Sequence, residues 1–312
     1  MSTQKQRDSD RNNSKDDVDV HAAIRTFVDT TSFELAAGDL KGLESAKPSL
    51  PVGTPISISW LPNGNHDARI ATARALTDSG LVAVPHIAAR RISSSVELDR
   101  LLARLADEAG VHRGFLVAGD MGNAQGTFSS SRQLLETGLF QRRGFKRIGI
   151  AGYPEGHPRI ESELLQTELY SKLVTIRNAG MESEIVMQFC FEAAPIRQWL
   201  GALRQDFPSV PVRIGLAGPA TIRTLIRFAK ICGLGASART IFSHGASIAR
   251  LLNEAGPDPI IRDLMSDPDL HGSQTMLHLF PFGGLGRTSR WVAAVRSGNF
   301  SLSGSEIGFR VG

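Results

Sequence analysis

The feature that most restricts the fold of this chain is a regular alternation between short apolar runs and longer stretches of helical spacing. Short apolar or β-branched runs bounded by turn-forming residues are typical of strands, and a strand buried on both faces reads as a nearly continuous apolar run. Eight such runs predict strands at Thr31–Leu35, Pro55–Leu61, Leu81–Ile87, Gly114–Gly119, Arg147–Tyr153, Glu184–Phe191, Val212–Ala217 and Gln274–Phe282.

The stretches between these runs favour helices, because apolar residues recur three and four positions apart and glycines follow several of them as typical C-caps. The predicted helices are Val18–Phe27, Asp67–Ser79, Ser93–Ala109, Ser131–Gly138, Ile160–Asn178, Ala193–Gln205, Ala220–Cys232 and Arg290–Arg296. Residues 233–271 are also helical in pattern but irregular, and we interpret them as an insertion.

This count and order of elements predict an α/β protein with a single-domain (β/α)8 TIM barrel over residues 18–312. The alternative is an open doubly wound sheet, which usually carries a glycine-rich phosphate-binding turn after its first strand. Here the first strand contains Glu34 and is followed by Ala36 and Ala37, so the barrel is favoured. Residues 1–17 are polar without an apolar core, and we predict a disordered tail there.

The amino-acid composition of the chain indicates which kinds of molecule it can bind. The chain has 312 residues, of which 41% are hydrophobic and 21% charged, with a net charge of +4. Lysines and arginines are spread among acids, which argues against a nucleic-acid partner, although a mild positive bias suits a small anionic ligand. The two cysteines form no C-x-x-C pair, and no apolar run is long enough for a membrane span. We expect a cytoplasmic protein; a homo-oligomer is left open.

Polar residues at the carboxyl ends of barrel strands are candidates for catalysis and binding. In this chain they are Glu34, Ser59, His86, Asp120, Tyr153, His157 and Gln188. Each could be an ordinary structural residue when taken alone. Successive strands supply such a residue at the same end, so the side chains are expected to converge and form a site.

Residues 147–158, with the sequence RIGIAGYPEGHP, are the most informative stretch. A short apolar strand ends in a turn that carries a phenol, a carboxylate and an imidazole. No H-x-x-x-H or clustered Asp/His spacing indicates a metal site, and no G-x-S-x-G or activated cysteine indicates a nucleophile. A metal-dependent barrel hydrolase is therefore a weaker alternative, which would require bound metal.

Residues 153–158 resemble the Y-P-E-x-H-P signature of the methylenetetrahydrofolate reductases, which are (β/α)8 barrels that carry FAD. Shorter segments resemble further motifs of this family in the same order, over most of residues 30–300. They are Ser32-Phe33-Glu34, Ser57-Ile58-Ser59-Trp60, Pro85-His86, Gly119-Asp120 and Gln188-Phe189.

The resemblance implies an oxidoreductase that interconverts 5,10-methylenetetrahydrofolate and 5-methyltetrahydrofolate with NADH or NADPH through bound FAD. It implies that Glu34 is the general acid that protonates the folate, and such an acid needs a raised pKa at neutral pH. Asp120 would lie near both folate and flavin, and Gln188 would hydrogen-bond the pterin. The residues that the resemblance assigns to FAD are Ser59, His86, Gly119, Asp120, Tyr153 and His157.

The chain departs from the family pattern directly after Glu34, where Leu35-Ala36-Ala37-Gly38 replaces aromatic and proline residues, and at three single positions. Ala118 replaces an arginine and Ile176 a lysine near the flavin phosphates, so we expect a weaker FAD site. Ile222 replaces an aromatic residue that stacks on the substrate, a role that Phe280 or Phe282 could take. After the last strand, Arg287 in a glycine-rich turn is a candidate for binding the carboxylates of the folate.

Two alternatives stay open at this point. One is a flavin-free variant that transfers hydride directly from the nicotinamide to the folate. The other is a folate-binding barrel that supports a methyltransferase without redox chemistry. If the chain is a reductase, its physiological direction could also be oxidative, in a pathway that disposes of methyl groups.

Overall fold

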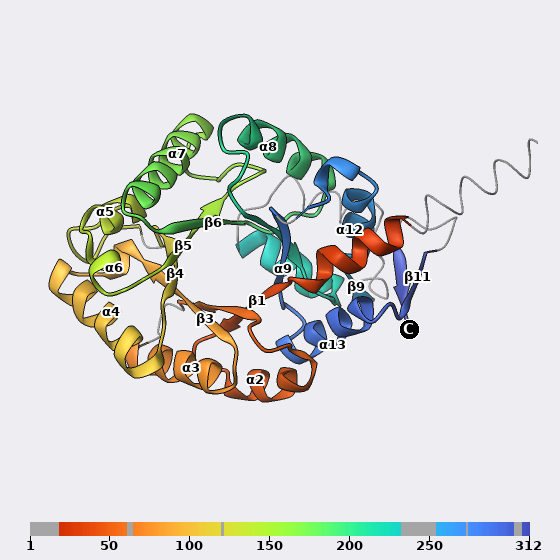
Figure 1. Cartoon of the computed structure of the whole chain (residues 1–312), viewed down its shortest axis with the longest axis horizontal. Coiled ribbons are helices and arrows are strands. Elements are labelled where there is room, and N and C mark those ends of the chain that lie inside the picture. Colours follow the sequence, from red (N-terminus) through yellow and green to blue (C-terminus); the bar gives the residue numbers. More distant parts are fainter. Residues whose placement is uncertain (1–18, 61–64, 120–121, 232–253, 273, 303–307) are drawn as a thin grey trace, which may run out of the picture.

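A closed barrel of eight parallel strands forms the centre of the computed structural model, which describes residues 19–60, 65–119, 122–231, 254–272, 274–302 and 308–312 (Figure 1). The strands are hydrogen-bonded in the order β1-β10-β7-β6-β5-β4-β3-β2, and the pairing of β1 with β10 closes the sheet. They are β1 (Ser32–Ala36), β2 (Pro55–Ser59), β3 (Val82–Ala88), β4 (Arg113–Val117), β5 (Arg147–Gly152), β6 (Glu182–Met187), β7 (Val212–Ala217) and β10 (Thr275–Phe280). The predicted (β/α)8 TIM barrel is confirmed.

Helices surround the barrel (Figure 1). They are a helix over residues 19–29, α2 (Leu40–Ala46), α3 (His66–Asp78), α4 (Ser95–Ala109), α5 (Ser131–Glu136), α6 (Leu139–Arg142), α7 (Ser162–Asn178), α8 (Ala193–Asp206), α9 (Ile222–Ile231), α12 (Asp258–Met265) and α13 (Leu285–Arg296). Short 3-10 turns lie at η1 (Lys47–Ser49), η2 (Ala89–Arg91) and η3 (Pro268–Leu270). Among the described residues, none of these helices is long and apolar enough to cross a membrane.

Helix α4 illustrates how the sequence specifies these elements. The side chain of Ser94 accepts a hydrogen bond from the backbone N–H of Glu97 and caps the first turn. Gly110 ends the helix with φ 61°, a left-handed conformation that glycine adopts without steric cost. The leucines at helical spacing are all buried against the barrel: Leu98, Leu101, Leu102 and Leu105.

Side chains of successive strand residues alternate between the surrounding helices and the barrel interior. On β2, Ile56 and Ile58 are fully buried in the main core, whereas Ser57 pairs in register with Glu34 of β1 and shares its face. Deeper in the barrel, Nε of Arg213 lies 3.0 Å from Oε1 of Glu184 in a buried ion pair. The interior is therefore lined by polar side chains rather than by a continuous apolar layer.

Several predicted boundaries shift for identifiable reasons. Strand β6 ends at Met187 instead of continuing to Phe191, so Gln188 follows the strand rather than lying on it. Helix α7 begins at Ser162 instead of Ile160, because His157 and Ile160 form an antiparallel bridge across the preceding turn. Ala220 and Thr221 form a short strand, β8, rather than the first turn of a helix.

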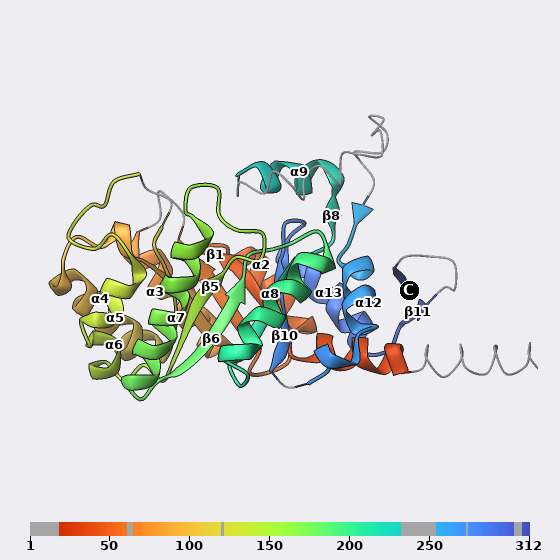
Figure 2. The same ribbon diagram turned by 90° about the horizontal axis from the view of Figure 1, so that it is seen from above.

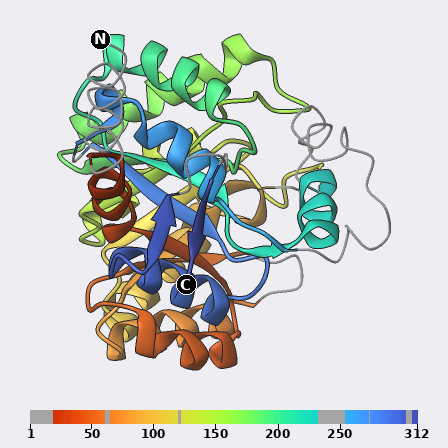
Figure 3. The same ribbon diagram turned by 90° about the vertical axis from the view of Figure 1, so that its right-hand side faces the viewer.

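Two peripheral pairs of strands complete the described chain. Strand β8 (Ala220–Thr221) pairs with β9 (Glu254–Ala255), and Figure 2 shows β8 and α9 standing clear of one end of the barrel. Strands β11 (Phe300–Leu302) and β12 (Phe309–Val311) form an antiparallel hairpin near α13 (Figure 3). The predicted tail at residues 1–17 and most of the predicted insertion lie outside the described residues.

Candidate active site

The carboxylate of Glu34 lies between two imidazoles inside the barrel. Its Oε1 is 3.4 Å from Nε2 of His86 on β3 and 3.8 Å from Nε2 of His278 on β10. The exposed fractions of the three side chains are 18% for Glu34, 13% for His86 and 1% for His278. Barrel closure thus brings together three titratable groups from three strands.

The two imidazole nitrogens that face Glu34 are unsatisfied. Both Nε2 atoms are buried, and neither has a hydrogen-bond partner among the described residues, since 3.4 and 3.8 Å are too long for a good hydrogen bond. The opposite nitrogen of His278, Nδ1, is 2.8 Å from Oγ of Ser32, which fixes the ring. Buried polar atoms without partners are uncommon and often mark places where a ligand or water completes the network.

The pKa of Glu34 is about 2, below its ordinary value of 4.5. Burial of the carboxyl raises this pKa, but the charge of His86 and the interactions with His278 lower it by more. Burial lowers the pKa of His278. The raised pKa that the acid role requires is therefore not found in this structure, because two imidazoles stabilise the carboxylate of Glu34.

The turn after β5 places Tyr153 and His157 together, with ring centroids 5.3 Å apart in an edge-to-face arrangement. The backbone N–H of Arg159 donates to Nδ1 of His157 at 3.2 Å. In the neutral imidazole the proton then lies on Nε2, which is available as a donor. Burial lowers the pKa of His157, as do the charges of Arg159 and Arg90. Burial raises the pKa of Tyr153.

Two further predicted positions line the same end of the barrel. The hydroxyl of Ser59 at the end of β2 donates to the carbonyl of Leu35 at 3.2 Å. Gly119 follows β4 with φ 96°, and a Cβ there would lie 3.4 Å from Cβ of Ala88. A side chain at 119 would be both strained and crowded, which explains the glycine. Asp120 lies outside the described residues, so its predicted role stays a prediction.

Phe280 and Phe189 form an aromatic wall beside His278. The ring of Phe280 lies 4.8 Å from that of His278 and 5.3 Å from that of Phe189, measured between centroids. Phe282 instead stacks on Phe228 of α9 at 4.0 Å. Of the two phenylalanines predicted to compensate for Ile222, Phe280 is thus the one next to the Glu34 cluster.

Gln188 directly follows β6 and precedes Phe189 of this wall. Its backbone N–H donates to the carbonyl of Gly152 at 2.8 Å. Its half-buried side-chain amide makes no hydrogen bond to the described part of the chain and is available to a ligand. Its predicted hydrogen bond to the pterin stays a prediction.

Two other predicted positions lie on helices. Arg287 is exposed on the first turn of α13, and its predicted role in binding the folate carboxylates stays a prediction. Ile176 is fully buried in the main core on α7. The apolar stripe of α7 turns this side chain toward the barrel wall, and the weaker FAD site expected from the loss of a lysine here stays a prediction.

His278 is the functional candidate that the sequence interpretation missed. It lies two residues before Phe280 on β10, and residues two apart in a strand face the same side. That spacing was the available signal. Among the described residues, no group of three or more His, Cys, Asp or Glu side chains has the arrangement to hold a metal ion.

A closed parallel sheet with polar side chains gathered at its strand ends defines the chain as a single-domain (β/α)8-barrel protein. No family model matches the chain. Among solved structures it is similar to a GH18 chitinase from Pseudoalteromonas aurantia, with 11% sequence identity, 86% of this chain and 99% of that chain covered, and a TM-score of 0.42. It is also similar to the catalytic domain of the β-amylase from Paenibacillus polymyxa, with 9% identity, 86% and 98% covered, and a TM-score of 0.41. At these scores the similarities carry no argument about the chemistry of the site.

Proposed function

We propose that the protein is an oxidoreductase of the methylenetetrahydrofolate reductase type, which interconverts 5,10-methylenetetrahydrofolate and 5-methyltetrahydrofolate with NADH or NADPH. The observation that carries the proposal is the position of Glu34 between His86 and His278, with the ring of Phe280 packed against His278. An acid in a cluster bordered by an aromatic ring suits protonation of a bound pterin. In the described part of the chain, the segments that resemble the family's motifs also lie on, or directly after, strands of one barrel.

The proposed reaction needs one hydride and one proton. In the reductive direction, hydride from NADH or NADPH reduces the one-carbon unit, and a proton given to the folate assists opening of the imidazolidine ring. The nicotinamide is oxidised, and the proton comes from Glu34 acting as general acid.

Glu34 must gain a proton before it can donate one. In the ligand-free site its pKa of about 2 makes it a carboxylate at neutral pH. A flat ligand that covers the mouth of the barrel would exclude water and disfavour the ionised form, which raises the pKa. His86 and His278 are the neighbouring groups that can pass the proton to it. We therefore treat the three side chains as one proton-holding unit.

The residues at this end fit a bound FAD. Ser59, His86, Tyr153 and the Nε2–H of His157 would hold it. The charges of Arg159 and Arg90 act on His157, where they lower its pKa together with the larger effect of burial. These arginines supply positive charge that Ala118 does not. When bound, FAD would accept and release hydride. The flavin-free variant would use the same Glu34 with direct transfer.

The visible absorption spectrum of the purified protein tests the cofactor, and NADH oxidation in the presence of methylenetetrahydrofolate tests the reaction. We expect folate-dependent oxidation of the nicotinamide that falls by about 10²- to 10⁴-fold in Glu34→Gln, while folate binding persists. Glu44→Gln, at an exposed glutamate on α2, serves as the matched control and should retain full activity.

Three outcomes separate the alternatives. A colourless protein with folate-dependent turnover supports the flavin-free variant. Folate binding without nicotinamide oxidation in the wild type supports a binding protein. Full turnover in Glu34→Gln would remove the acid role assigned to this residue.

A further inference from the structure

Arg69 on α3 is a fully buried arginine that has no carboxylate partner among the described residues. Its guanidinium carbon lies 3.4 Å from the centroid of the Trp60 ring. The Nε and Nη2 atoms are buried and have no hydrogen-bond partner in the described part of the chain. A buried charge normally needs a counter-charge, and here the π face of an indole takes that place.

The third nitrogen of the guanidinium contacts a histidine one turn earlier on the same helix. Nη1 of Arg69 lies 3.4 Å from Nδ1 of His66, and Nε2 of this imidazole lies 3.0 Å from Oε1 of Glu97 on α4. An ionised carboxylate can only accept, so in the neutral imidazole Nε2 carries the proton and donates to Glu97. Nδ1 is then free to accept the hydrogen bond from Arg69.

We propose that His66 is a pH-sensitive switch for Arg69, and that Arg69 is a positioning residue for Trp60 at the mouth of the barrel. Neutral His66 holds the guanidinium on the face of the indole. Protonated His66 carries an N–H on both nitrogens, so that its Nδ1–H and its positive charge face the N–H groups of a second cation. Arg69 then leaves the ring. The proposal does not depend on the reaction proposed for the mouth.

Glu97 determines that the arginine moves and the histidine stays. Burial of Glu97 raises its pKa, but hydrogen bonds from Ser93 and the contact with His66 lower it by more. Glu97 is therefore still ionised when His66 takes up a proton, and it holds the imidazolium in place. Its Oε2 accepts from the backbone N–H of Ser93 at 2.7 Å, so this oxygen is already engaged and does not compensate Arg69.

The other charges nearby do not hold Arg69 either. Arg100 and Arg104 of α4 line a surface pocket together with His66, and Arg104 lies 2.7 Å from Oδ1 of Asp67 in an ion pair. Burial and the charge of Arg91 lower the pKa of Arg69 to about 10. Arg69 is therefore still a cation at neutral pH and below, and Arg91 repels it. Among these groups Arg69 has the weakest hold.

The switch acts on the rim of the barrel mouth. Trp60 comes directly after Ser59, at the carboxyl end of β2, and its side chain is half-buried. At neutral pH Arg69 supports the face of this indole, and His66 lies edge-on to it with ring centroids 5.4 Å apart. In acid the ring loses the support on its face, so the β2 side of the mouth is held less tightly.

NMR of the side-chain Nε–H of Arg69 in the full-length protein tests the proposal. The resonance is identified by its loss in Arg69→Lys, and the ring current of Trp60 shifts it upfield while the guanidinium lies on the indole. We expect it to move downfield in a single transition between about pH 8 and pH 5, the range in which histidines take up a proton. In His66→Gln, which cannot become charged, it should stay upfield at both pH values.

His112→Gln, at an exposed histidine, is the matched control and should keep the transition of the wild type. An upfield resonance at both pH values in the wild type would overturn the proposal. A transition that persists in His66→Gln would also overturn it, because another group would then drive the movement. The emission of Trp60, taken as the difference between the wild type and Trp60→Phe, provides a second measurement. Its pH dependence should disappear in Arg69→Met, and persistence there would mean that His66 acts on the indole without Arg69.

Discussion

Glu34 and His278 come from the two strands whose pairing closes the barrel, and Oε1 of the first lies 3.8 Å from Nε2 of the second. The two residues are far apart in the sequence, so their contact exists only when the sheet is closed. Because each side chain changes the pKa of the other, the protonation state of the site depends on closure. Assembly of the barrel is therefore also assembly of the proton-holding unit.

Replacement of His278 by glutamine should raise the pKa of Glu34 from about 2 toward 4.5, because the variant loses one of the imidazoles that stabilise the carboxylate. Carboxyl-carbon NMR of the ligand-free protein measures this pKa. His112→Gln, at an exposed histidine that contacts the carbonyl of Gly144, is the control and should leave it unchanged. An unaltered pKa in His278→Gln would mean that His86 alone sets the ionisation of Glu34.

The stability of the protein should fall in acid partly through Glu34. Its folded-state pKa of about 2 lies below its ordinary value of 4.5, so the carboxylate stabilises the folded state above pH 4.5. That contribution is lost as the pH falls from about 4.5 to about 2, with a slope of up to about 1.4 kcal/mol per pH unit. Urea unfolding across this range should show a shallower pH dependence for Glu34→Gln than for the wild type. The same pH dependence of stability in the wild type and in Glu34→Gln would contradict the lowered pKa of Glu34.

The sequence predicts the barrel and much of its mouth because strand ends can be recognised one at a time. Glu34, Ser59, His86 and Tyr153 each stand where an apolar run meets a turn, and closure brings such positions to one end. The pKa of Glu34 could not be predicted in this way, since it depends on a partner from β10. His278 lies within a strand, and only the two-residue period of that strand marks it as facing the axis.

Local periodicity explains the burial of Ile176, which the match to a family motif did not address. Ile176 lies seven residues after Leu169 and three after Leu173, and all three are buried on one face of α7. Helical spacing alone would have placed Ile176 in the core.

Short elements were missed for another reason. Helix α2 contains Gly42 and depends on the cap from Asp39, which accepts from the backbone N–H of Gly42 at 2.9 Å.

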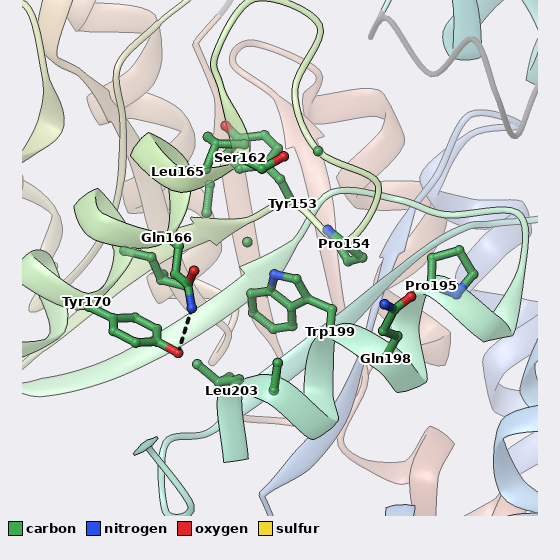
Figure 4. A pocket seen from close by; sticks show the side chains of 15 residues that line it. Tyr153, Pro154, Ser162, Leu165, Gln166, Tyr170, Pro195, Gln198, Trp199 and Leu203 are labelled. Carbon is green, nitrogen blue, oxygen red and sulfur yellow. Dashed lines mark hydrogen bonds between the residues drawn. The ribbon is translucent and has the colours of Figure 1, made fainter. Parts of the chain in front are cut away.

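Gly152→Ala should destabilise the protein by about 1–3 kcal/mol, because the indole of Trp199 (Figure 4) and the side chain of Ile185 leave no room for a methyl group at this glycine. A Cβ at 152 would lie 2.9 Å from Cγ2 of Ile185 and 3.0 Å from the ring of Trp199. Gly201→Ala is the matched control, since it lies within α8 with nothing near its Cβ position. Alanine there should stabilise by about 0.5–1 kcal/mol. Urea unfolding measures both, and equal effects of the two changes would contradict the packing described.

Removal of one charge from the ion pair between Glu184 and Arg213 should strongly destabilise the folded protein. Both side chains are almost fully buried, with exposed fractions of 10% and 6%, and Nη1 of Arg213 also donates to the carbonyl of Thr30 at 2.9 Å. Glu184→Gln leaves the guanidinium buried without a counter-charge, and we expect a loss of about 3–5 kcal/mol in the free energy of unfolding.

The same strand supplies the control for this pair. Glu182, two residues earlier on β6, pairs with Arg147, but its side chain is 65% exposed. Surface ion pairs contribute little, so Glu182→Gln should change the free energy of unfolding by less than about 1 kcal/mol. The double variant Glu184→Leu with Arg213→Met removes both charges, and it should recover much of the stability lost in Glu184→Gln. If Glu184→Gln and Glu182→Gln unfold at the same urea concentration, the prediction is contradicted. That result would mean that water inside the barrel hydrates the charges of Glu184 and Arg213.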